Sequence, residues 1–417
     1  MLFPAIILAI ATSSLGCAQA TNTTESENDY LNALAAAFAD AGLTALRDAA
    51  ARLSNTSYGR TIVSRLSQGG NYTIFAPTNE AFSGASDELA SNDELLARLL
   101  SYHIVAGDFT NDNGTLASSL SPNNTVGRTL LNDTGVVQLE GNKSQVLVWS
   151  SLNDEIIIQN QALNITVLQS SVVPNTSVLL NSINGFLAYP TNTTSTLVAH
   201  NLTSLTGLLE STNFTASSTG LNRTLHTGFD EMAHGFTLFA PNNKAVVDAG
   251  DYLASYAGNM TAFAAIVGNH VINGTTLYSP ELKHAGTLTS GSGEGLMFTS
   301  NSSGTFVTST VGKSHVASAR IIASDIPTMN GVIHIIDHVL LSVYTDKAAA
   351  KSAYESMTQS SGNQNATATE TGAVGGQTMQ SANGAVLSKA QLGNKASGLA
   401  NMALGVLGLT TLRAAMI

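Results

Sequence analysis

Apolar residues follow a helical spacing early in each half of the chain and a strand-like pattern later. Residues 29–53 carry an apolar residue every three or four positions among many alanines, which predicts one or two helices broken near Gly42. Two further helices are predicted where apolar residues recur at i, i+3, i+4 and i+7 and end in a histidine: Leu96, Leu99, Leu100 and His103, then Phe263, Ile266, Val267 and His270. Before the first of these, residues 91–94 match a capping box with Ser91 as the N-cap.

Strands are predicted after these helices in both halves. The segments are 145–150, 155–159, 163–173 and 179–188, then 295–299, 304–310, 315–323 and 331–341. Trp149, the single tryptophan, lies in one of them and is expected in the core rather than as a platform for sugars. Helices followed by strands, twice over, predict an α+β fold in which a β-sandwich or wedge is packed by helices at one end.

One phrase of the sequence occurs twice, at residues 73–82 and again 164 positions later at 237–246. Each copy has an apolar run, then Phe-Ala-Pro, then a residue suited to cap a helix (Thr78 or Asn242). Because proline ends the donation of ladder hydrogen bonds, each copy predicts a buried strand, a sharp turn and a helix start. Repeats at this spacing are whole domains, since solenoid units repeat every few tens of residues.

Other motifs follow in the same order. Tyr102-His103 in the first half corresponds to Asn269-His270 in the second, which then carries Asp325-Ile326 and the run 330–340 with Asn-Gly-Val-Ile-His-Ile-Ile-Asp. The first half has a weaker version of that run at 179–187. Together with Phe-Ala-Pro, these motifs resemble the fasciclin domain, an extracellular adhesion module. The resemblance implies two tandem fasciclin-like domains, over 28–190 and 194–343, with the α+β architecture predicted above.

The resemblance also implies candidate binding residues, because the Tyr-His region and a nearby Asp-Ile pair of animal fasciclin domains have been linked to receptor binding. The matching residues here are Tyr102, His103, His270, Asp325 and Ile326. Neither half has the whole set: aligned without a gap, the first has Val172-Val173 where the second has Asp325-Ile326. The alternative interpretation of both histidines is structural, with ring nitrogens bonded to the backbone and the helix end held against the sheet.

Composition fits a secreted globular protein. Of the 417 residues, 43% are hydrophobic and only 11% are charged. The net charge of −11 argues against a nucleic-acid partner, which would require a basic face. Cys17 is the only cysteine, so a chain that has lost its leader has no disulfide and no thiolate chemistry.

Both ends of the chain carry targeting features. Residues 1–20 predict a signal peptide with an Ala-x-Ala cleavage site, and a lipidated Cys17 is a minor alternative. Residues 346–382 are rich in Ser, Thr and Gly and predict a disordered stalk. Residues 383–417 combine small residues at Asn383, a polar spacer and an apolar tail, which predicts a GPI-attachment signal at Asn383. The alternative is an amphipathic or disordered tail on a soluble secreted protein.

Glycosylation signals are dense. Asn-x-Ser/Thr triplets expected to carry glycans begin at Asn22, Asn55, Asn113, Asn123, Asn132, Asn142, Asn175, Asn192, Asn201, Asn213, Asn222, Asn259, Asn273, Asn301 and Asn365. Two more, Asn71 and Asn164, are expected to stay unmodified because they lie at or in predicted strands.

Catalytic and metal-binding patterns find little support in the sequence. It lacks a Gly-x-Ser-x-Gly elbow and a phosphate-binding loop. His334 and His338 lie four residues apart, but on a strand they would be roughly 13 Å apart, too far for one metal ion. His334 and Asp337 are therefore expected to make structural hydrogen bonds. We expect neither enzyme activity nor a cofactor nor a metal.

The sequence as a whole predicts a glycosylated, GPI-anchored protein of a cell surface or fungal cell wall. Its expected function is cell adhesion, or binding to matrix proteins or wall polysaccharides. The alternatives are a structural wall glycoprotein without a specific ligand and, less favoured, a secreted hydrolase with acidic catalytic residues.

Overall fold

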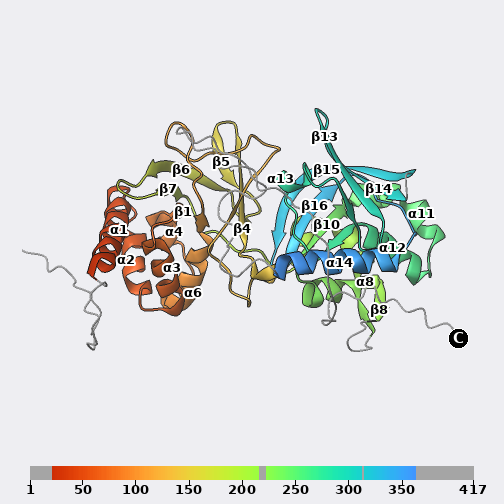
Figure 1. Ribbon diagram of the computed structural model, residues 1–417, viewed down its shortest axis with the longest axis horizontal. Helices are drawn as coiled ribbons and strands as arrows, with labels where there is room; N and C mark the ends of the chain where they lie inside the picture. Colours follow the sequence, from red (N-terminus) through yellow and green to blue (C-terminus); the bar gives the residue numbers. More distant parts are fainter. Residues whose placement is uncertain (1–20, 216–221, 312–313, 363–417) are drawn as a thin grey trace, which may run out of the picture.

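A computed structural model describes residues 21–215, 222–311 and 314–362 of the chain. They form two domains that lie side by side along the long axis of the molecule (Figure 1). Each domain holds one seven-stranded sheet with several helices packed against it. The predicted α+β architecture is confirmed.

The first domain begins with helices and ends with strands. Its helices are α1 (Thr21–Asp40), α2 (Thr44–Leu53), α3 (Ser57–Ser67), α4 (Asn79–Ser83), α5 (Asp87–Ser91), α6 (Asp93–Tyr102) and the short η1 (Glu140–Asn142). Its strands are β1 (Tyr72–Pro77), β2 (Ile104–Ala106), β3 (Thr125–Arg128), β4 (Val146–Leu152), β5 (Glu155–Ile158), β6 (Ile165–Val172) and β7 (Val178–Ile183). The predicted break near Gly42 separates α1 from α2, and Gly42 has a φ of 72° that glycine adopts without strain.

The second domain repeats this arrangement. Its helices are α7 (Thr193–Ala199), α8 (Thr203–Ser211), α9 (Leu225–Thr227), η2 (Gly228–Met232), α10 (Asn243–Asp248), α11 (Gly250–Ser255), α12 (Met260–Asn269) and α13 (Ser279–Leu282), followed by α14 (Lys347–Gly362). Its sheet contains β10 (Phe236–Pro241), β11 (Val271–Asn273), β12 (Thr287–Thr289), β13 (Gly295–Asn301), β14 (Gly304–Val311), β15 (Ser314–Thr328) and β16 (Gly331–Ile336). A separate two-stranded sheet pairs β8 (Asn213–Thr215) with β9 (Asn222–Thr224).

The strand order of the two sheets is the same. It runs β2-β1-β7-β6-β5-β4-β3 in the first domain and β11-β10-β16-β15-β14-β13-β12 in the second. In each sheet the Phe-Ala-Pro strand pairs in parallel with the last strand, and antiparallel with the short strand that follows the histidine. The repeated phrase therefore marks repeated domains, as predicted.

Helix caps explain why the phrase turns from strand to helix. The side chains of Thr78 and Asn242 accept hydrogen bonds from the amides of Ala81 and Ala245, at 3.4 and 2.8 Å. The predicted capping box was wrong by one residue. Asn92, not Ser91, caps α6 by accepting from Leu95 at 3.0 Å.

The segment 190–194 has a linker-like composition, but the structure places it within the fold. Thr193 is fully buried, and its hydroxyl bonds the Asn330 side chain at 3.1 Å. The amide of Met329 donates to the carbonyl of Thr191 at 2.8 Å. This connection between the domains is fixed by contacts with the second sheet.

Part of the predicted stalk is also ordered, because residues 347–362 form helix α14 instead of a disordered chain. Asp346 starts it, since its carboxylate accepts from the amides of Ala348 and Ala349 at 3.1 and 2.9 Å. From there α14 runs along the second domain toward the first and contacts η1 (Figure 1). The predicted signal peptide, the remainder of the stalk, and the GPI signal with Asn383 lie outside the described residues.

Within residues 21–215, 222–311 and 314–362, no helix is long and apolar enough to cross a lipid bilayer.

Candidate functional site

The two predicted histidines occupy equivalent places, one at the C-terminal end of α6 and one at that of α12. Nδ1 of His103 lies 2.9 Å from the carbonyl of Leu99, and its Nε2 accepts from the amide of Leu187 at 2.9 Å. His270 makes the same two contacts, 2.7 Å from the carbonyl of Ile266 and 2.9 Å from the amide of Leu340. Each histidine thus links the end of its helix, by a hydrogen bond, to the segment that follows the last strand of its sheet (β7 or β16). The structural interpretation of both residues is confirmed.

These contacts fix the protonation of both rings. A carbonyl requires a proton on Nδ1 and an amide requires a lone pair on Nε2, so each ring is the neutral Nδ1–H tautomer. Burial lowers the pKa of His103 and of His270 to about 4 in each case. We call this arrangement the histidine clasp.

Tyr102 lies beside the clasp and belongs to the core. Its ring is 1% exposed, and its hydroxyl donates to the carbonyl of Val146 at 3.1 Å. Its equivalent Asn269 is likewise buried and donates to Ser309 at 2.9 Å and to the carbonyl of Leu340 at 3.2 Å. The position therefore joins the end of the helix to the sheet in both domains.

Asp325 lies on a β-bulge that the first domain lacks. Register shifts by one residue on β15 between Ala323 and Ile326, whereas β6 pairs without interruption from Gln169 to Val172. Through their partners on the last strand, Ser171 and Val172 correspond to Ile326 and Pro327. The gapless alignment of Val172-Val173 with Asp325-Ile326 was therefore wrong. Asp325 has a φ of 62°, and bulges of this kind redirect a side chain.

The bulge directs Asp325 into the junction between the domains. Its carboxylate accepts from the amide and hydroxyl of Ser279, at 2.5 and 2.6 Å, and from the side chain of Asn124 at 2.9 Å. Its carbonyl accepts from the Asn160 side chain at 2.9 Å. Asn124 and Asn160 belong to the first domain. Asp325 therefore joins the two domains, while Ile326 packs in the core of the second.

A second buried carboxylate joins the domains from the other side. Glu140 of the first domain accepts from the amide and the hydroxyl of Thr276 in the second, each at 3.0 Å. Lys143 contacts the same carboxylate at 3.0 Å. Gly235 fits against it only because it lacks a side chain: a Cβ there would lie within 2.4 Å of a Glu140 oxygen.

Apolar and cationic contacts complete the junction. Val126, Val146 and Val148 of the first sheet form one buried cluster with Tyr278 and Val332 of the second domain. The Arg128 guanidinium lies 5.4 Å from the centre of the Tyr278 ring. Two hydrogen bonds extend the junction further. The amide of Gln138 donates to the carbonyl of Met329 at 2.6 Å, and the side chain of Gln145 donates to the carbonyl of Thr328 at 3.0 Å. We call this set of contacts the interdomain seam.

All five candidate binding residues are thus buried, with exposures from 0 to 4% for the set Tyr102, His103, His270, Asp325 and Ile326. The structure uses them for core packing, the histidine clasp and the seam, and direct contact with a partner stays a prediction. Sequence reasoning missed Glu140, Asn124, Thr276 and Ser279, because seam contacts join residues more than 40 positions apart and leave no periodic signal.

The remaining polar candidates have structural partners. His334 is fully buried, with Nε2 2.8 Å from the carbonyl of Leu277 and Nδ1 accepting from the Asp325 amide at 3.3 Å. Asp337 accepts from the Arg320 amide at 2.7 Å and contacts His338 at 2.8 Å. The predicted structural role of both is confirmed. Across the described ranges, no group of three or more His, Cys, Asp or Glu side chains is placed to hold a metal ion.

The glycosylation asparagines are mostly exposed. Those with exposed side chains are Asn55, Asn71, Asn113, Asn123, Asn132, Asn142, Asn164, Asn175, Asn201, Asn213, Asn259 and Asn301. Exposure thus gives no support to the expectation that Asn71 and Asn164 stay unmodified. Asn192 is half-buried as the N-cap of α7, and Asn273 is half-buried with a fully buried Oδ1.

Comparison with known proteins decides the family. The fasciclin domain model matches residues 49–187 and again residues 200–342. The chain belongs to the fasciclin domain family. It is 28% identical over 284 residues to a fasciclin-like arabinogalactan protein of Arthroderma benhamiae, which covers 66% of this chain and 59% of that protein. This chain therefore matches less than two thirds of its fungal relative.

Shorter fasciclin relatives come from mycobacteria. The immunogenic protein MPB70 of Mycobacterium bovis is 41% identical over 83 residues, covering 18% of this chain and 37% of that protein. The cell surface glycolipoprotein MPB83 of the same species is 46% identical over 43 residues, covering 9% and 20%. Among solved structures, a FAS1 domain pair from the insect cell adhesion molecule Fasciclin I covers 73% of this chain and 98% of its own, at 16% identity and a TM-score of 0.32.

Proposed function

We propose that this chain is an extracellular cell-surface glycoprotein whose fasciclin domains mediate cell adhesion or bind matrix proteins or cell-wall polysaccharides. The observation that carries the proposal is the pair of fasciclin domains held by a buried seam. Such a pair presents two domains at a fixed spacing, and weak binding by each domain becomes strong when many anchored copies act together.

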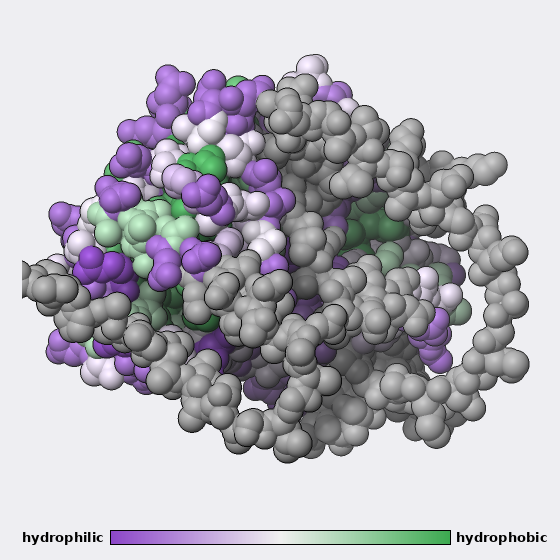
Figure 2. Space-filling view, turned by 60° about the vertical axis from the view of Figure 1, so that its left-hand side comes forward, coloured by the Kyte–Doolittle hydropathy of each residue, from purple (hydrophilic) through white to green (hydrophobic). Residues whose placement is uncertain are grey.

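The outer surface supports this proposal. Figure 2 shows hydrophilic residues over most of the described part of one face, around a smaller pale-green area. Exposed glycosylation signals occur from Asn55 to Asn301. Only 11% of the residues are charged, so hydroxyl and amide groups, and the glycans we propose, give this surface its polarity.

The proposed address is the outside of the cell, with a GPI anchor at Asn383 to the plasma membrane or a link to the wall. The experiment is release from intact cells by a phosphatidylinositol-specific phospholipase, followed by mass spectrometry of the new C-terminus. A glycolipid remnant at Asn383 supports the anchor. Retention of residues 399–412 in the mature protein contradicts it.

Binding itself is tested with the deglycosylated domain pair, residues 21–362, on immobilised wall polysaccharide, on matrix proteins and on intact cells. Saturable binding by the deglycosylated pair is the expected result. Binding that is lost with the glycans would instead favour a structural wall glycoprotein. One observation favours that second candidate: all five family-derived binding residues are buried.

A further inference from the structure

Helix α14 starts beside a loop of the second domain and runs to the first domain (Figure 1). Its start is closely fixed. The Asp346 amide donates to the carbonyl of Ser292 at 2.8 Å, and a Cβ on Gly293 would lie 2.1 Å from the Asp346 carbonyl oxygen. The helix also contacts η1, which carries Glu140 of the first domain. Because α14 is attached to one domain and touches the other, it crosses the interdomain seam.

The helix lies next to the contact that Glu140 makes between the domains. Atoms of Tyr354 and Thr358 lie 3.1 and 3.3 Å from the place where a Cβ on Gly274 would be. Gly274 precedes by two residues Thr276, whose amide and hydroxyl donate to Glu140. The last turns of α14 therefore cover the segment that holds this buried carboxylate.

Mostly small side chains hold α14 in place. Ala350 is buried. The half-buried residues on the same side of the helix are Ala349, Ala353, Tyr354, Met357 and Thr358. An alanine buries little apolar surface, and a helix of 16 residues is only marginally stable in water by itself. Such shallow packing makes α14 easy to detach.

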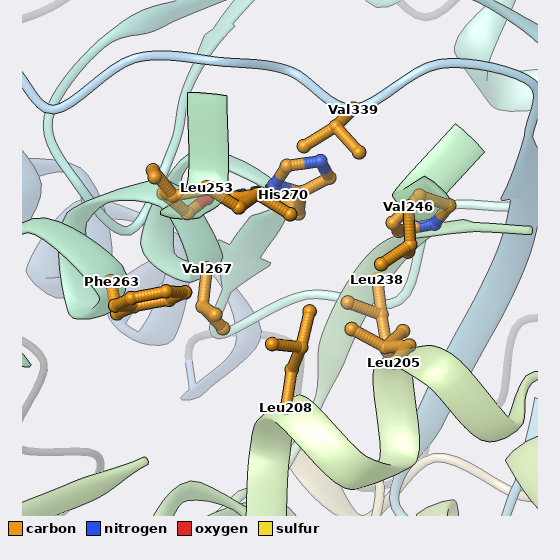
Figure 3. A pocket seen from close by; sticks show the side chains of 11 residues that line it. Leu205, Leu208, Leu238, Val246, Leu253, Phe263, Val267, His270 and Val339 are labelled. Atoms are coloured by element: carbon orange, nitrogen blue, oxygen red, sulfur yellow. Dashed lines mark hydrogen bonds between the residues drawn. The ribbon is translucent and has the colours of Figure 1, made fainter. Parts of the chain in front are cut away.

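Helices α8 and α12 of the same domain are held more firmly. Leu205 and Leu208 of α8 point into one small space (Figure 3). Phe263 and Val267 of α12 enter the same space, of which only about 30 Å³ is free. Detaching either helix would expose several of these large apolar side chains at once, whereas detaching α14 would expose one aromatic ring, that of Tyr354. Under load, α14 should therefore leave before α8 or α12.

The position of α14 in the chain decides how a load reaches it. Residues 363–417 follow directly on its last residue, so a pull on that segment acts first on the end of the helix near the first domain. Pulling on this end breaks the contacts one turn at a time, from residue 362 back toward Asp346. This requires less force than breaking all the contacts of the helix together.

We propose that α14 is a release strap: tension on the C-terminal segment peels it from the second domain while both sheets stay folded, and so uncovers the Glu140–Thr276 contact of the seam. Without tension the strap closes again, because its cap at Asp346 and the surface beneath it remain in place. A loaded molecule then has a looser seam, and its two domains can turn relative to each other. The inference rests on the proposed attachment to the cell surface, which supplies the tension.

Single-molecule pulling on residues 21–362 tests the strap directly. One handle is attached to a cysteine that replaces the exposed Thr299 of the second domain, and the other to residue 362. The only natural cysteine, Cys17, lies outside this chain. We expect a reversible step at a lower force than any unfolding of a domain. Its length gain should be roughly 3–8 nm, set by the direction of pull and by residues that stretch to about 56 Å from a helix of about 24 Å.

Two variants show whether the step belongs to α14. Tyr354→Ala removes the ring from its place against Gly274 and should shorten the lifetime of the closed strap at a fixed force at least fivefold. Gln359→Ala, on the exposed side of the helix, is the matched control and should leave that lifetime unchanged. A chain that ends at residue 346, with its handle there, should lack the step.

Hydrogen exchange followed by NMR tests whether the strap covers the seam. The Thr276 amide, which donates to Glu140 at 3.0 Å, should exchange at least tenfold faster in the chain that ends at residue 346 than in the chain that ends at 362. The Phe239 amide, which donates to the carbonyl of His270 inside the second domain, should exchange equally in both chains.

Two results would overturn the strap. One is a first step whose length shows that strands of the second sheet unfold together with α14. The other is a Thr276 amide that exchanges equally with and without α14. A step of the expected size, found together with a mature protein that retains residues 399–412, would leave the strap standing and contradict only the proposed membrane anchor.

Discussion

At the scale of single residues, the histidine clasp shows how a titratable group is used as a neutral one. Each ring donates to one carbonyl and accepts from one amide, so a second proton would turn the Nε2 acceptor into a donor facing the Leu187 or Leu340 amide. Burial adds to this effect, and the pKa of each histidine falls to about 4.

Stability should therefore fall in mild acid. Between pH 6.5 and 4 the unfolded chain binds a proton at each histidine that the folded chain does not, so the free energy of unfolding decreases as the pH is lowered through this window. The full loss below pH 4 is about 3 kcal/mol for each histidine. Urea unfolding of residues 21–362 at a series of pH values measures it. His270→Gln should flatten the slope, because it removes one of the two titrating rings.

Phe239 belongs to a buried apolar cluster of the second domain. Its ring is fully buried and lies 5.5 Å from Phe298 and 5.6 Å from His334. Phe239→Ala should lower the free energy of unfolding by about 3–5 kcal/mol, because it removes a whole ring from a packed core. A loss below about 1 kcal/mol in urea unfolding would contradict this placement.

The sequence predicted residue roles where a local pattern carries them. Thr78 and Asn242 as caps, both histidines at helix ends and Trp149 in the core are found as expected. The contact of Asp325 with the first domain was not predicted, because a one-residue bulge cannot be seen in an ungapped comparison. Partners for Glu140 could not be predicted, since its contact with Thr276 depends on how two domains meet.

At the scale of secondary-structure elements, α14 is a helix in a segment whose composition predicts a disordered stalk. Ala350 is buried and Tyr354 is half-buried. The Tyr354 ring packs against Gly274, since a Cβ added there would lie 3.1 Å from it. The helix is stabilised by its cap at Asp346, a residue type that often precedes helices, and by the surface on which it lies, which its own sequence does not show.

Removing α14 should loosen the molecule. A chain that ends at residue 346 should lose about 2 kcal/mol of stability relative to one that ends at 362, because Tyr354 and Ala350 no longer cover the second domain. It should also be cut faster by protease near η1, which α14 contacts. Urea unfolding and limited proteolysis of the two chains measure both effects. Identical behaviour would mean that the helix does not dock.

At the scale of the whole molecule, the seam makes two homologous domains into one unit. It buries two carboxylates, a valine cluster and Thr193 of the connection, and the amide of Met329 bonds the carbonyl of Thr191. A connection held in place by such bonds cannot extend into a protease active site, so we expect no cleavage at 190–196 in the native chain. Cleavage there under native conditions would contradict the seam.

The seam should also make the domains unfold together. Thr276→Val removes the hydroxyl from Glu140 and leaves part of a buried carboxylate without a donor, which costs about 1.5–3 kcal/mol. Because the loss falls on the contact between domains, it should split one thermal transition into two, as seen by calorimetry. The exposed Thr299→Val is the matched control and should leave a single transition. If Thr276→Val instead leaves one unsplit transition and lowers its midpoint by no more than the control does, Glu140 is not what holds the domains together. If the transition does split, the variant's domains separate from each other before both unfold. That variant would no longer present its two faces at a fixed spacing, and any binding it retains would have to be carried by each domain alone.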